Sequence, residues 1–460
     1  MMVDFLSDAG PRRALAPGGL PRLIPVAAAP DPGLAGHLDR LGPPAHSPGA
    51  MPPGLARAII AEAEAAGLTG RGGAAFPVHR KLSAVASAPG RLTGRAAVAV
   101  ANGAEGEPAS GKDRSLLWLA PHLVLDGLQL AAAAAGAARA VLYVHRDRAL
   151  AAHLAAALAQ RAAAGCDPRP AELVQAPDRF LAGETSALIS ALSGGAARPR
   201  FAVPPVYQRG IGGQPTLVQN VETLAHLALI GRFGASWFRG AGLPGEPGSM
   251  LCTMLRADGG SHVTEAALGT PLASLLPGLR PPGRREAGPR EAGPGREIQA
   301  VLVGGYHGTW LDPARAAGLS LSRASLRTAG ASPGAGVLAE LPASRCGLAE
   351  TARVARYLAL ESAGQCGPCF NGLPRIAAAL GELAAPRPAP GARADLRRWA
   401  GLVAGRGACH HPDGFVQFVA SALGAFAEET ARHARGECRA TDRSPFLPVP
   451  APPATEADWS

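Results

Sequence analysis

Two cysteines, Cys366 and Cys369, stand three positions apart in the stretch ESAGQCGPCFNGLPRI. This spacing fits a redox dithiol, a zinc site or an iron–sulfur cluster. A thioredoxin-type dithiol requires a strand just before the pair, but the helical pattern of residues 348–360 precedes it and more helical sequence follows. A zinc site would add Cys409 and either His410 or the histidine after it. An iron–sulfur cluster would use the same three cysteines, so both metal alternatives stay open at this point.

A glycine-rich stretch, GLTGRGGAAFP at residues 67–77, is a second candidate site. Glycines allow unusual backbone angles and let the chain come close to a ligand. Backbone amides together with the cations of Arg71 and Lys81 are what a phosphate group needs. Of the 45 lysine and arginine residues only Lys81 and Lys112 are lysines, which marks both as places where a compact ammonium group matters. The glycine spacing matches neither common nucleotide-binding motif, GxGxxG or GxxxxGK(S/T).

Polar side chains in three further stretches could bind the hydroxyl groups of a sugar or a ribityl chain. In VANGAEGEPASGKDR they follow a predicted strand at residues 95–102, and carboxylates at such a strand end accept hydrogen bonds from hydroxyls. The other two stretches are LAGETSAL and QPTLVQNVETLA, where the same residue types also commonly cap helices. The candidate residues are Asn102, Glu105, Glu107, Gly183, Glu184, Asn220 and Thr223.

The periodicity around these stretches predicts three structural units. Strand patterns alternate with helical patterns up to about residue 240, which indicates an α/β domain. Short strands with turns follow, interrupted by a low-complexity insertion in which REAGP occurs twice, and the helical periodicity that then returns favours a bundle. The predicted boundaries are an N-terminal arm at 1–50, the α/β domain at 51–240, the β domain at 248–312 with a disordered insertion at 280–297, the bundle at 335–440 and a flexible tail at 441–460.

Composition narrows the class of protein. With 47% apolar and 17% charged residues the chain is typical of a globular protein, and its start lacks the pattern of a signal peptide. Its seven cysteines are dispersed, which favours reduced thiols and a cytoplasmic location. The net charge of +10 is spread out, so nucleic acid is not an expected partner. Polar residues interrupt the apolar run at 123–144, which predicts a buried helix and strand and no membrane span.

Taken in their order along the chain, these stretches resemble the flavin-binding subunit of respiratory NADH:quinone oxidoreductase, the NuoF family, and the related diaphorase subunits of NAD-linked hydrogenases and formate dehydrogenases. The resemblance covers roughly residues 50–435 and rests on GRGGAAFP, NGAEGEP, KDR, AGETSAL, QPTLVQNVET, LGTPL, VGG and ESAGQCGPC. It implies a Rossmann-like FMN domain, a β-grasp-like domain of the SLBB type and a helical bundle that holds an iron–sulfur cluster.

The resemblance also implies roles for single residues. Lys81 falls near the flavin phosphate, and Phe76 matches an aromatic residue suited to stack on nicotinamide. Cysteines 366, 369 and 409 match cluster ligands. The implied FMN contacts are Gly70, Gly72, Gly73, Lys81, Asn102, Glu105, Glu107, Gly183, Glu184, Asn220 and Thr223.

The cluster motif departs from the family pattern at one position. The family has a cysteine where this chain has Ala363, and alanine cannot ligate iron. The candidates for a fourth ligand are His410 and the more distant Cys346, and the cluster is expected to be a [4Fe–4S] or a [3Fe–4S] type. Cys166 and Cys438, like Cys252, have no partners by spacing and are expected to be ordinary thiols.

Further departures lie in the region that the family uses for NAD(H). Ala104 and Thr185 stand where the family has acidic residues, Val203 replaces a lysine and Gln219 replaces an asparagine. The loss of a cation and two carboxylates should weaken NADH binding, whereas the flavin contacts are better preserved.

Together these observations predict an enzyme, a NADH dehydrogenase-like flavoprotein that uses FMN and an iron–sulfur cluster to pass electrons from NAD(P)H to an iron–sulfur or ferredoxin-like partner. A position peripheral to a membrane complex is compatible with this prediction. The alternative is a non-catalytic or zinc-stabilised scaffold subunit of a redox complex, with a degenerate nucleotide pocket.

Overall fold

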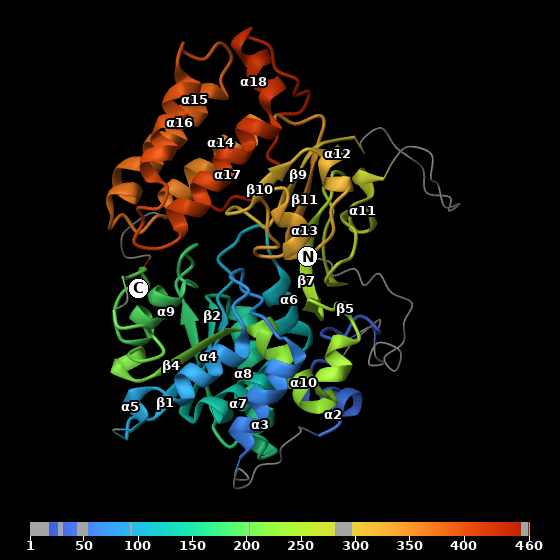
Figure 1. Cartoon of the computed structure of the whole chain (residues 1–460), viewed down its shortest axis with the longest axis vertical. Helices are drawn as coiled ribbons and strands as arrows, with labels where there is room; N and C mark the ends of the chain where they lie inside the picture. The colour runs from blue at the N-terminus through green and yellow to red at the C-terminus, as the bar shows by residue number, and fades with distance from the viewer. Residues whose placement is uncertain are drawn as a thin grey trace, which may run out of the picture.

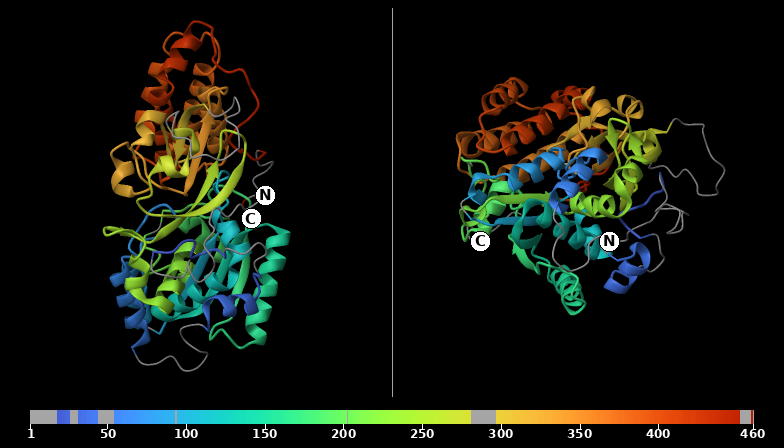
Figure 2. Two further views of the ribbon diagram at one scale, coloured as in Figure 1. Left: turned by 90° about the vertical axis from the view of Figure 1, so that its right-hand side faces the viewer. Right: turned by 60° about the horizontal axis from the view of Figure 1, so that its bottom comes forward.

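The computed structural model describes residues 18–25, 31–43, 54–92, 94–201, 203–280, 297–451 and 459. They form an α/β unit at one end of the long axis, a mixed sheet beside it and a helical region at the other end (Figure 1). The same succession is visible from the side in Figure 2. The predicted combination of an α/β unit, a β-rich unit and C-terminal helices is therefore confirmed.

The α/β unit is built on a four-stranded sheet in which every neighbouring pair is parallel. The central strand β1 reads AVAVANG and is buried along most of its length, as expected for a strand covered on both faces. Its alanines belong to the core on one face, and its two valines belong to the smaller core on the other. In sheet order the strands are β3 (Ala171–Ala176), β2 (Ala137–His145), β1 (Ala97–Gly103) and β4 (Thr216–Asn220).

Helices cover both faces of this sheet. The alanine-rich helix α7 packs closely on α10, because Gly127 leaves room for the backbone of Leu224, whose carbonyl oxygen would lie 1.9 Å from any Cβ there. The smaller core, on the opposite face, includes Leu188 of α9. The helices are α3 (Leu55–Ala66), α4 (Val78–Ala86), α5 (Pro89–Leu92), α6 (Lys112–Leu119), α7 (Pro121–Ala135), α8 (Arg148–Ala163), α9 (Thr185–Leu192), the 3-10 turn η1 (Ile211–Gly213) and α10 (Val221–Arg239).

A short hairpin of β5 (Gly242–Leu243) and β6 (Glu246–Pro247) leads into a five-stranded mixed sheet. In this sheet β7 and β11 pair in parallel, and the other neighbours are antiparallel. Its strands are β7 (Ser249–Leu255), β8 (Ser261–Ala267), β9 (Ile298–Val303), β10 (Thr309–Leu311) and β11 (Val337–Pro342). The short helices around it are α11 (Leu272–Leu275), η2 (Pro277–Leu279), α12 (Pro313–Ala317) and α13 (Arg323–Arg327).

The helical region follows β11 directly. A π-helical turn, η3 (Pro368–Gly372), stands where the two close cysteines occur, between α14 and α15. The α14 helix packs against both α15 and α17, and these helices share one apolar core with a face of the mixed sheet. Its helices are α14 (Gly347–Leu360), α15 (Leu373–Leu383), α16 (Ala392–Val403), α17 (His411–Ala425) and α18 (Ala427–Ala434).

The described parts of the predicted N-terminal arm and C-terminal tail contain more regular structure and buried contacts than the sequence predicts. Within the predicted N-terminal arm, α2 (Leu34–Leu41) forms a helix, and Arg22 is buried with its backbone N–H bonded to Glu265. In the predicted flexible tail, Leu447 is buried and its N–H donates to the Glu350 carboxylate at 3.0 Å. Apolar side chains in both segments pack into the core. The high proline content of these segments obscures this apolar pattern in the sequence. The rest of the arm and the insertion at 281–296 lie outside the described residues.

No single helix in the described part of the chain is both long and apolar enough to cross a membrane. The pair α6 and α7 passes the test of length and composition only when joined across a 98° bend. Most residues of α7 are buried in the α/β core, which is where the sequence predicts a buried helix.

Candidate functional site

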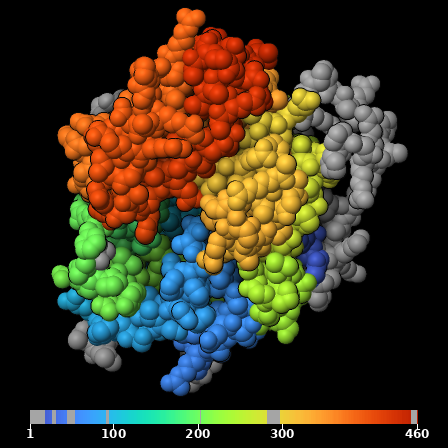
Figure 3. Space-filling model, turned by 45° about the horizontal axis from the view of Figure 1, so that its top comes forward, coloured from blue at the N-terminus to red at the C-terminus, as the bar shows by residue number. Residues whose placement is uncertain are grey.

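A cavity of about 600 Å³ opens beside the carboxyl ends of β1 and β4. Its size lies within the range of about 300–1,000 Å³ that cofactor sites usually have. All three units contribute to its walls, and they meet on the face of the molecule shown in Figure 3. Most of the residues that the sequence singled out line it: Gly70, Gly72, Gly73, Phe76, Lys81, Asn102, Glu107, Gly183, Glu184, Asn220 and Thr223.

The glycine-rich stretch forms a tight loop at one wall of the cavity. The N–H of Gly70 donates to the Phe76 carbonyl at 3.0 Å, and a backbone bridge joins Thr69 to Pro77. Gly73 has a φ of +101°, which a residue with a side chain rarely adopts. The loop is fixed to the first turn of α10, where the Arg71 N–H donates to the Thr223 hydroxyl at 2.8 Å. The glycine residues of this loop are therefore held at the cavity edge.

The Arg71 side chain does not serve the cavity, contrary to the sequence prediction. It is buried and points away, toward the entrance of the mixed sheet. Its guanidinium donates to the backbone carbonyls of Ser249 at 3.0 Å, Thr69 at 3.0 Å and Pro247 at 3.4 Å. Arg71 therefore ties the loop to the next unit and leaves the phosphate role to another cation.

Lys81 is the cation that remains available for a phosphate group in the cavity. It lies on α4, lines the cavity, and makes one long contact, 3.4 Å from its Nζ to the Val218 carbonyl. Within the described part of the chain its ammonium has no carboxylate partner, and burial lowers its pKa from the usual value. A half-buried ammonium without a counter-ion suits an anionic ligand group.

Asn102 and Asn220 lie side by side, because β1 and β4 pair in a register that matches these two residues. The Asn102 amide donates to the Gly183 carbonyl at 2.8 Å, which holds the AGETSAL loop against the end of β1. Gly183 is required for that approach, since a Cβ there would lie 2.3 Å from the Ala104 carbonyl oxygen. Glu184 begins α9 and accepts from the N–H of Ser186 at 2.8 Å.

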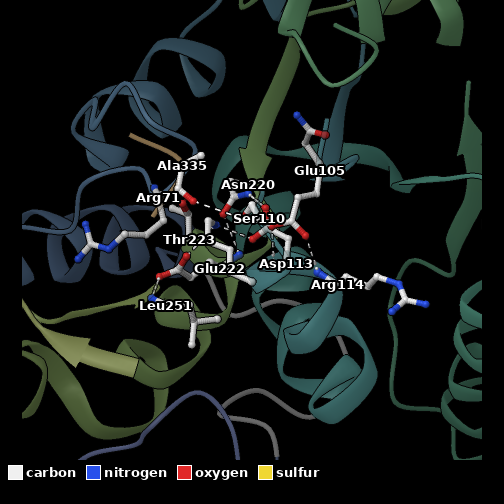
Figure 4. Close-up of polar contacts among 12 residues, drawn as sticks. Arg71, Glu105, Ser110, Asp113, Arg114, Asn220, Glu222, Thr223, Leu251 and Ala335 are labelled. Carbon is white, nitrogen blue, oxygen red and sulfur yellow. Dashed lines mark hydrogen bonds and ion pairs between the residues drawn. The ribbon is translucent and has the colours of Figure 1, made fainter. Parts of the chain in front are cut away.

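The two glutamates of the carboxylate loop have different positions. Glu105 does not line the cavity, and its carboxylate caps α6 by accepting from the N–H groups of Asp113 at 3.2 Å and Arg114 at 3.1 Å (Figure 4). The Glu105 carboxylate is thus engaged by α6, and its predicted role as a direct FMN contact stays a prediction. Glu107 lines the cavity, accepts from the Tyr306 N–H at 2.7 Å, and has its pKa raised to about 7 by burial.

Beneath the cavity lies a buried network of ionised side chains. Lys112 Nζ stands 2.6 Å from Asp113 and 2.9 Å from Glu222. Burial disfavours the ammonium, but these carboxylates raise the pKa of Lys112 above its usual value. Asp113 accepts from the Asn220 amide at 2.7 Å, and Glu222 accepts from the Leu251 N–H at 2.8 Å (Figure 4). Lys112, the second lysine of the chain, thus holds together the charged residues that lie beneath the cavity.

Three cysteines gather next to the cavity. Burial raises the pKa of the Cys369 thiol to about 12, and the neighbouring Cys366 and Cys409 raise it as well. Cys409 itself lines the cavity, so the thiol group and the cavity adjoin each other. The fourth position of the motif is Ala363, so the motif offers three thiols, which lie near enough to one another to influence the pKa of Cys369. This donor set fits an iron–sulfur cluster in which one iron lacks a cysteine.

The two candidate fourth ligands differ in position. Cys346 precedes α14 and Cys366 follows it, and a helix of 14 residues is about 21 Å long, so Cys346 cannot reach the same cluster. His410 is fully exposed beside Cys409 and lines the cavity. The neighbouring histidine, His411, uses both ring nitrogens, at 3.0 Å to His307 and 2.9 Å to the Leu358 carbonyl.

The sequence did not single out His307 and Phe180, which form a cluster of rings with His411 in the cavity wall. His307, His411 and Phe180 line the cavity, with ring centroids 5.0 Å apart for Phe180 and His307. Burial lowers the pKa of His411 to about 4 and that of His307 well below its usual value, so both rings are neutral. The two adjacent histidines in HHPDG are the only sequence signal for this cluster. His307 cannot be found in this way, because it comes from another unit of the chain.

The positions that depart from the family pattern divide into two groups. Ala104, Thr185 and Gln219 line the cavity, so their changed chemistry bears directly on a ligand. Val203 is 75% exposed and is not among the lining residues. Phe76, 45% exposed at the rim, presents an aromatic face to the same space.

Two parts of the chain match models of known protein families. Residues 63–229 match the Nuo51 FMN-binding domain, and residues 349–433 match the NADH-ubiquinone oxidoreductase-F iron-sulfur binding region. The first match contains the cavity loops, and the second contains all three clustered cysteines.

Curated relatives span most of the chain. The F 2 subunit of NADH-quinone oxidoreductase in Rhizobium meliloti (strain 1021) is 28% identical over 385 residues, which are 82% of this chain and 88% of that protein. The F subunit of NADH-quinone oxidoreductase in Rickettsia bellii (strain OSU 85-389) is 30% identical over 328 residues, 68% of this chain and 75% of that protein.

Solved structures of a NAD⁺-reducing [NiFe]-hydrogenase share the fold. The H₂-reduced state aligns with a TM-score of 0.69 at 29% identity and covers 83% of this chain. The air-oxidized state aligns with a TM-score of 0.70 at 28% identity and covers 86% of this chain. The chain spans 62% and 66% of the lengths of these two hydrogenase chains.

Proposed function

The chain belongs to the NuoF family of NADH-quinone oxidoreductase subunits, and we propose that it oxidises NAD(H) with FMN held in the cavity and passes the electrons to an iron–sulfur cluster at Cys366, Cys369 and Cys409. The observation that carries this proposal is the shared wall. One cavity is lined by the glycine loop, by Lys81 and by Cys409, so the flavin site and the cluster site adjoin.

The residues of the cavity fit FMN group by group. Lys81 and the glycine loop would hold the phosphate, because they supply a free ammonium and a close backbone. Asn102 and Glu184 have polar atoms at the strand ends, where they would bind the ribityl hydroxyls. When bound, FMN supplies the chemistry that joins hydride transfer to single-electron transfer. The protein binds and orients it, and no side chain needs to act as a nucleophile.

The nicotinamide would enter beside Phe76 at the cavity rim. Because Ala104 and Thr185 line this space without acidic side chains, they offer fewer charged hydrogen-bond partners to the ribose and phosphates of NADH. We therefore expect NADH to bind weakly compared with FMN. Glu107 lies in the same wall, and because burial raises its pKa to about 7, its charge changes with pH near neutrality.

The cluster would be held by three cysteine thiolates. Metal binding would deprotonate the Cys369 and Cys409 thiols, whose pKa values burial raises in the metal-free protein. His410 is the exposed side chain nearest in sequence to Cys409 and is the remaining candidate for the iron that lacks a cysteine.

The wider assignments follow from family membership. We propose that the α/β unit is Rossmann-like, that the mixed sheet, which includes β11, is a β-grasp-like domain of the SLBB type, and that the helical region from α14 onward serves as the cluster domain. The electron acceptor would be an iron–sulfur or ferredoxin-like protein, and the relatives' names as subunits are consistent with a place in a larger complex. A scaffold without a cofactor fits less well, because it leaves the half-buried ammonium of Lys81 without a counter-ion among the residues that the structure describes.

Steady-state turnover tests this function. Full-length protein, purified without oxygen and supplied with FMN, should reduce a one-electron dye with NADH, and the Cys369→Ser variant should lose iron. Phe76→Ala should raise the KM for NADH several-fold and leave the FMN content unchanged, since Phe76 would stack on nicotinamide only. Protein that contains FMN and iron but reduces no dye with NADH or NADPH would exclude the dehydrogenase assignment.

A further inference from the structure

A second group of metal-ligating side chains lies at the far end of the helical region. Cys346, Glu429, His433 and Cys438 each offer one ligand atom, and these four atoms all lie within 4.8 Å of one another. Cys346 is the N-cap of α14, the two middle residues lie on α18, and Cys438 follows α18. The length of α14 separates this group from the three-cysteine site at the other end of the helix.

The separations within the group match those around a tetrahedral ion. Cys346 Sγ lies 3.6 Å from His433 Nε2, and Glu429 Oε1 lies 3.3 Å from the same nitrogen. Tetrahedral zinc, with Zn–S bonds of about 2.3 Å and Zn–N or Zn–O bonds of about 2.0–2.1 Å, sets such neighbouring ligand atoms about 3.6 Å and about 3.4 Å apart. The Glu429–His433 separation also exceeds the usual hydrogen-bond length of about 2.9 Å.

Three of the four side chains are removed from water. Cys346 is 6% exposed, Glu429 2% and His433 1%. Among the described residues Glu429 Oε2 has no hydrogen-bond partner, and Arg439 Nε stands 3.8 Å from it. A buried carboxylate beside two thiols requires compensation by positive charge. Cys438 is exposed, and a cavity of about 230 Å³ lined by Cys346, His433 and Cys438 gives an ion a path from solvent.

We propose that Cys346, Glu429, His433 and Cys438 bind one Zn²⁺ ion. Two thiols, an imidazole and a carboxylate form a closed set of four protein ligands, which is the arrangement of structural zinc sites. On binding, both thiols release their protons to solvent and the thiolates ligate the metal, with no change of oxidation state. The ion joins the start of α14 to the segment after α18, so it closes the helical region at its two ends.

Metal content of the full-length protein, purified anaerobically, tests the site. The wild type and the matched control Cys166→Ser, a cysteine outside both groups, should each contain one zinc per chain in addition to iron. Cys438→Ser and His433→Ala should lose the zinc and retain the iron. Absorption fine structure at the zinc edge of the wild type should show two sulfur neighbours at about 2.3 Å and two nitrogen or oxygen neighbours at about 2.0–2.1 Å.

The wild-type measurements do not depend on whether a variant folds. A wild type that stays zinc-free after dialysis against zinc chloride overturns the proposal, and so does a Cys346–Cys438 disulfide in the anaerobic protein. Zinc that is lost in Cys369→Ser but kept in Cys438→Ser overturns it too, because the metal would then occupy the three-cysteine site. None of these outcomes bears on NADH oxidation, which is measured separately.

Discussion

At the scale of single residues, Lys81 carries the most specific role in the cavity, because its ammonium faces the ligand space without a carboxylate partner among the described residues. We predict that Lys81→Met weakens FMN binding about 10- to 100-fold, since a hydrogen bond to a charged group contributes about 1.5–3 kcal/mol. Quenching of flavin fluorescence on titration with the protein measures this affinity.

Its matched control is Arg80→Gln, which removes an exposed cation from the neighbouring position of α4. This control should bind FMN like the wild type. Equal affinities for Lys81→Met and Arg80→Gln would show that the ammonium does not contact the phosphate.

Glu107 gives the site a dependence on pH. Its pKa rises from an ordinary value of 4.5 to about 7 through burial, so between these values the folded state holds a proton that the unfolded state releases. Stability from this group is therefore full below pH 4.5 and is lost as pH rises toward 7. We predict that Glu107→Gln flattens the decline in melting temperature of the flavin-free protein over this interval. Parallel melting curves for variant and wild type would contradict the role of burial.

At the scale of elements, the segment between α14 and α15 decides the type of cluster. In this segment Ala363 stands where the family has a cysteine, so one iron lacks a cysteine ligand. We predict that the wild-type cluster loses about one of four iron atoms on oxidation, whereas Ala363→Cys retains all of them. Iron analysis and electron paramagnetic resonance after oxidation follow the loss.

The control for this variant is Ser362→Cys, which places a thiol one residue away from the ligand position. It should behave like the wild type. If Ser362→Cys protects the iron as well as Ala363→Cys does, the effect comes from thiol content and not from ligation.

The junction of α6, α10 and β7 depends on Lys112, which compensates two buried carboxylates. We predict that Lys112→Met destabilises the α/β unit by about 3–5 kcal/mol, because Asp113 and Glu222 stay buried without a cation. Its control, Arg114→Met, breaks an exposed ion pair with Asp147 and should cost less than about 1 kcal/mol. Calorimetry measures both. A Lys112→Met protein of unchanged stability that fails to bind FMN would instead make Lys112 a ligand.

The sequence predicts the elements better than the directions of side chains. Hydrophobic periodicity locates β1 and α7, and motif order identifies the loops that line the cavity. It does not show that Arg71 turns toward the carbonyls of Pro247 and Ser249, because those partners lie far away along the chain. It also does not show that the nearby N–H groups of α6 engage the Glu105 carboxylate, because periodicity does not determine which way a side chain in a loop turns.

Long-range contacts also explain the other differences. Cys438 has no partner by spacing along the sequence, yet α14 and α18 bring it close to Cys346. The sequence instead indicated Cys346 as a candidate fourth ligand for the cluster at Cys366, Cys369 and Cys409. His307 joins the cavity from the loop between β9 and β10, a unit that carries no other predicted ligand. The order of the tail follows from Leu447, which is buried between the prolines, and from Phe446 and Val449, which pack against the same core.

At the scale of the whole molecule, the site exists only where three units meet. The α/β unit supplies the loops for FMN, the mixed sheet supplies His307, and the helical region supplies Cys409 (Figure 1). Electrons that enter at the rim beside Phe76 would therefore leave through the helical region. A truncated α/β unit would lack the parts of the cavity wall that the mixed sheet and the helical region supply.

The central claim is that this one cavity holds FMN in electronic contact with a cluster at the adjoining cysteines. The most direct measurement is the visible spectrum of the full-length protein under anaerobic conditions, recorded before and after addition of NADH. The account predicts a yellow-brown protein whose flavin and iron–sulfur absorbance both decrease when NADH is added. A protein without flavin, or a bound flavin whose absorbance NADH and NADPH leave unchanged, would contradict it.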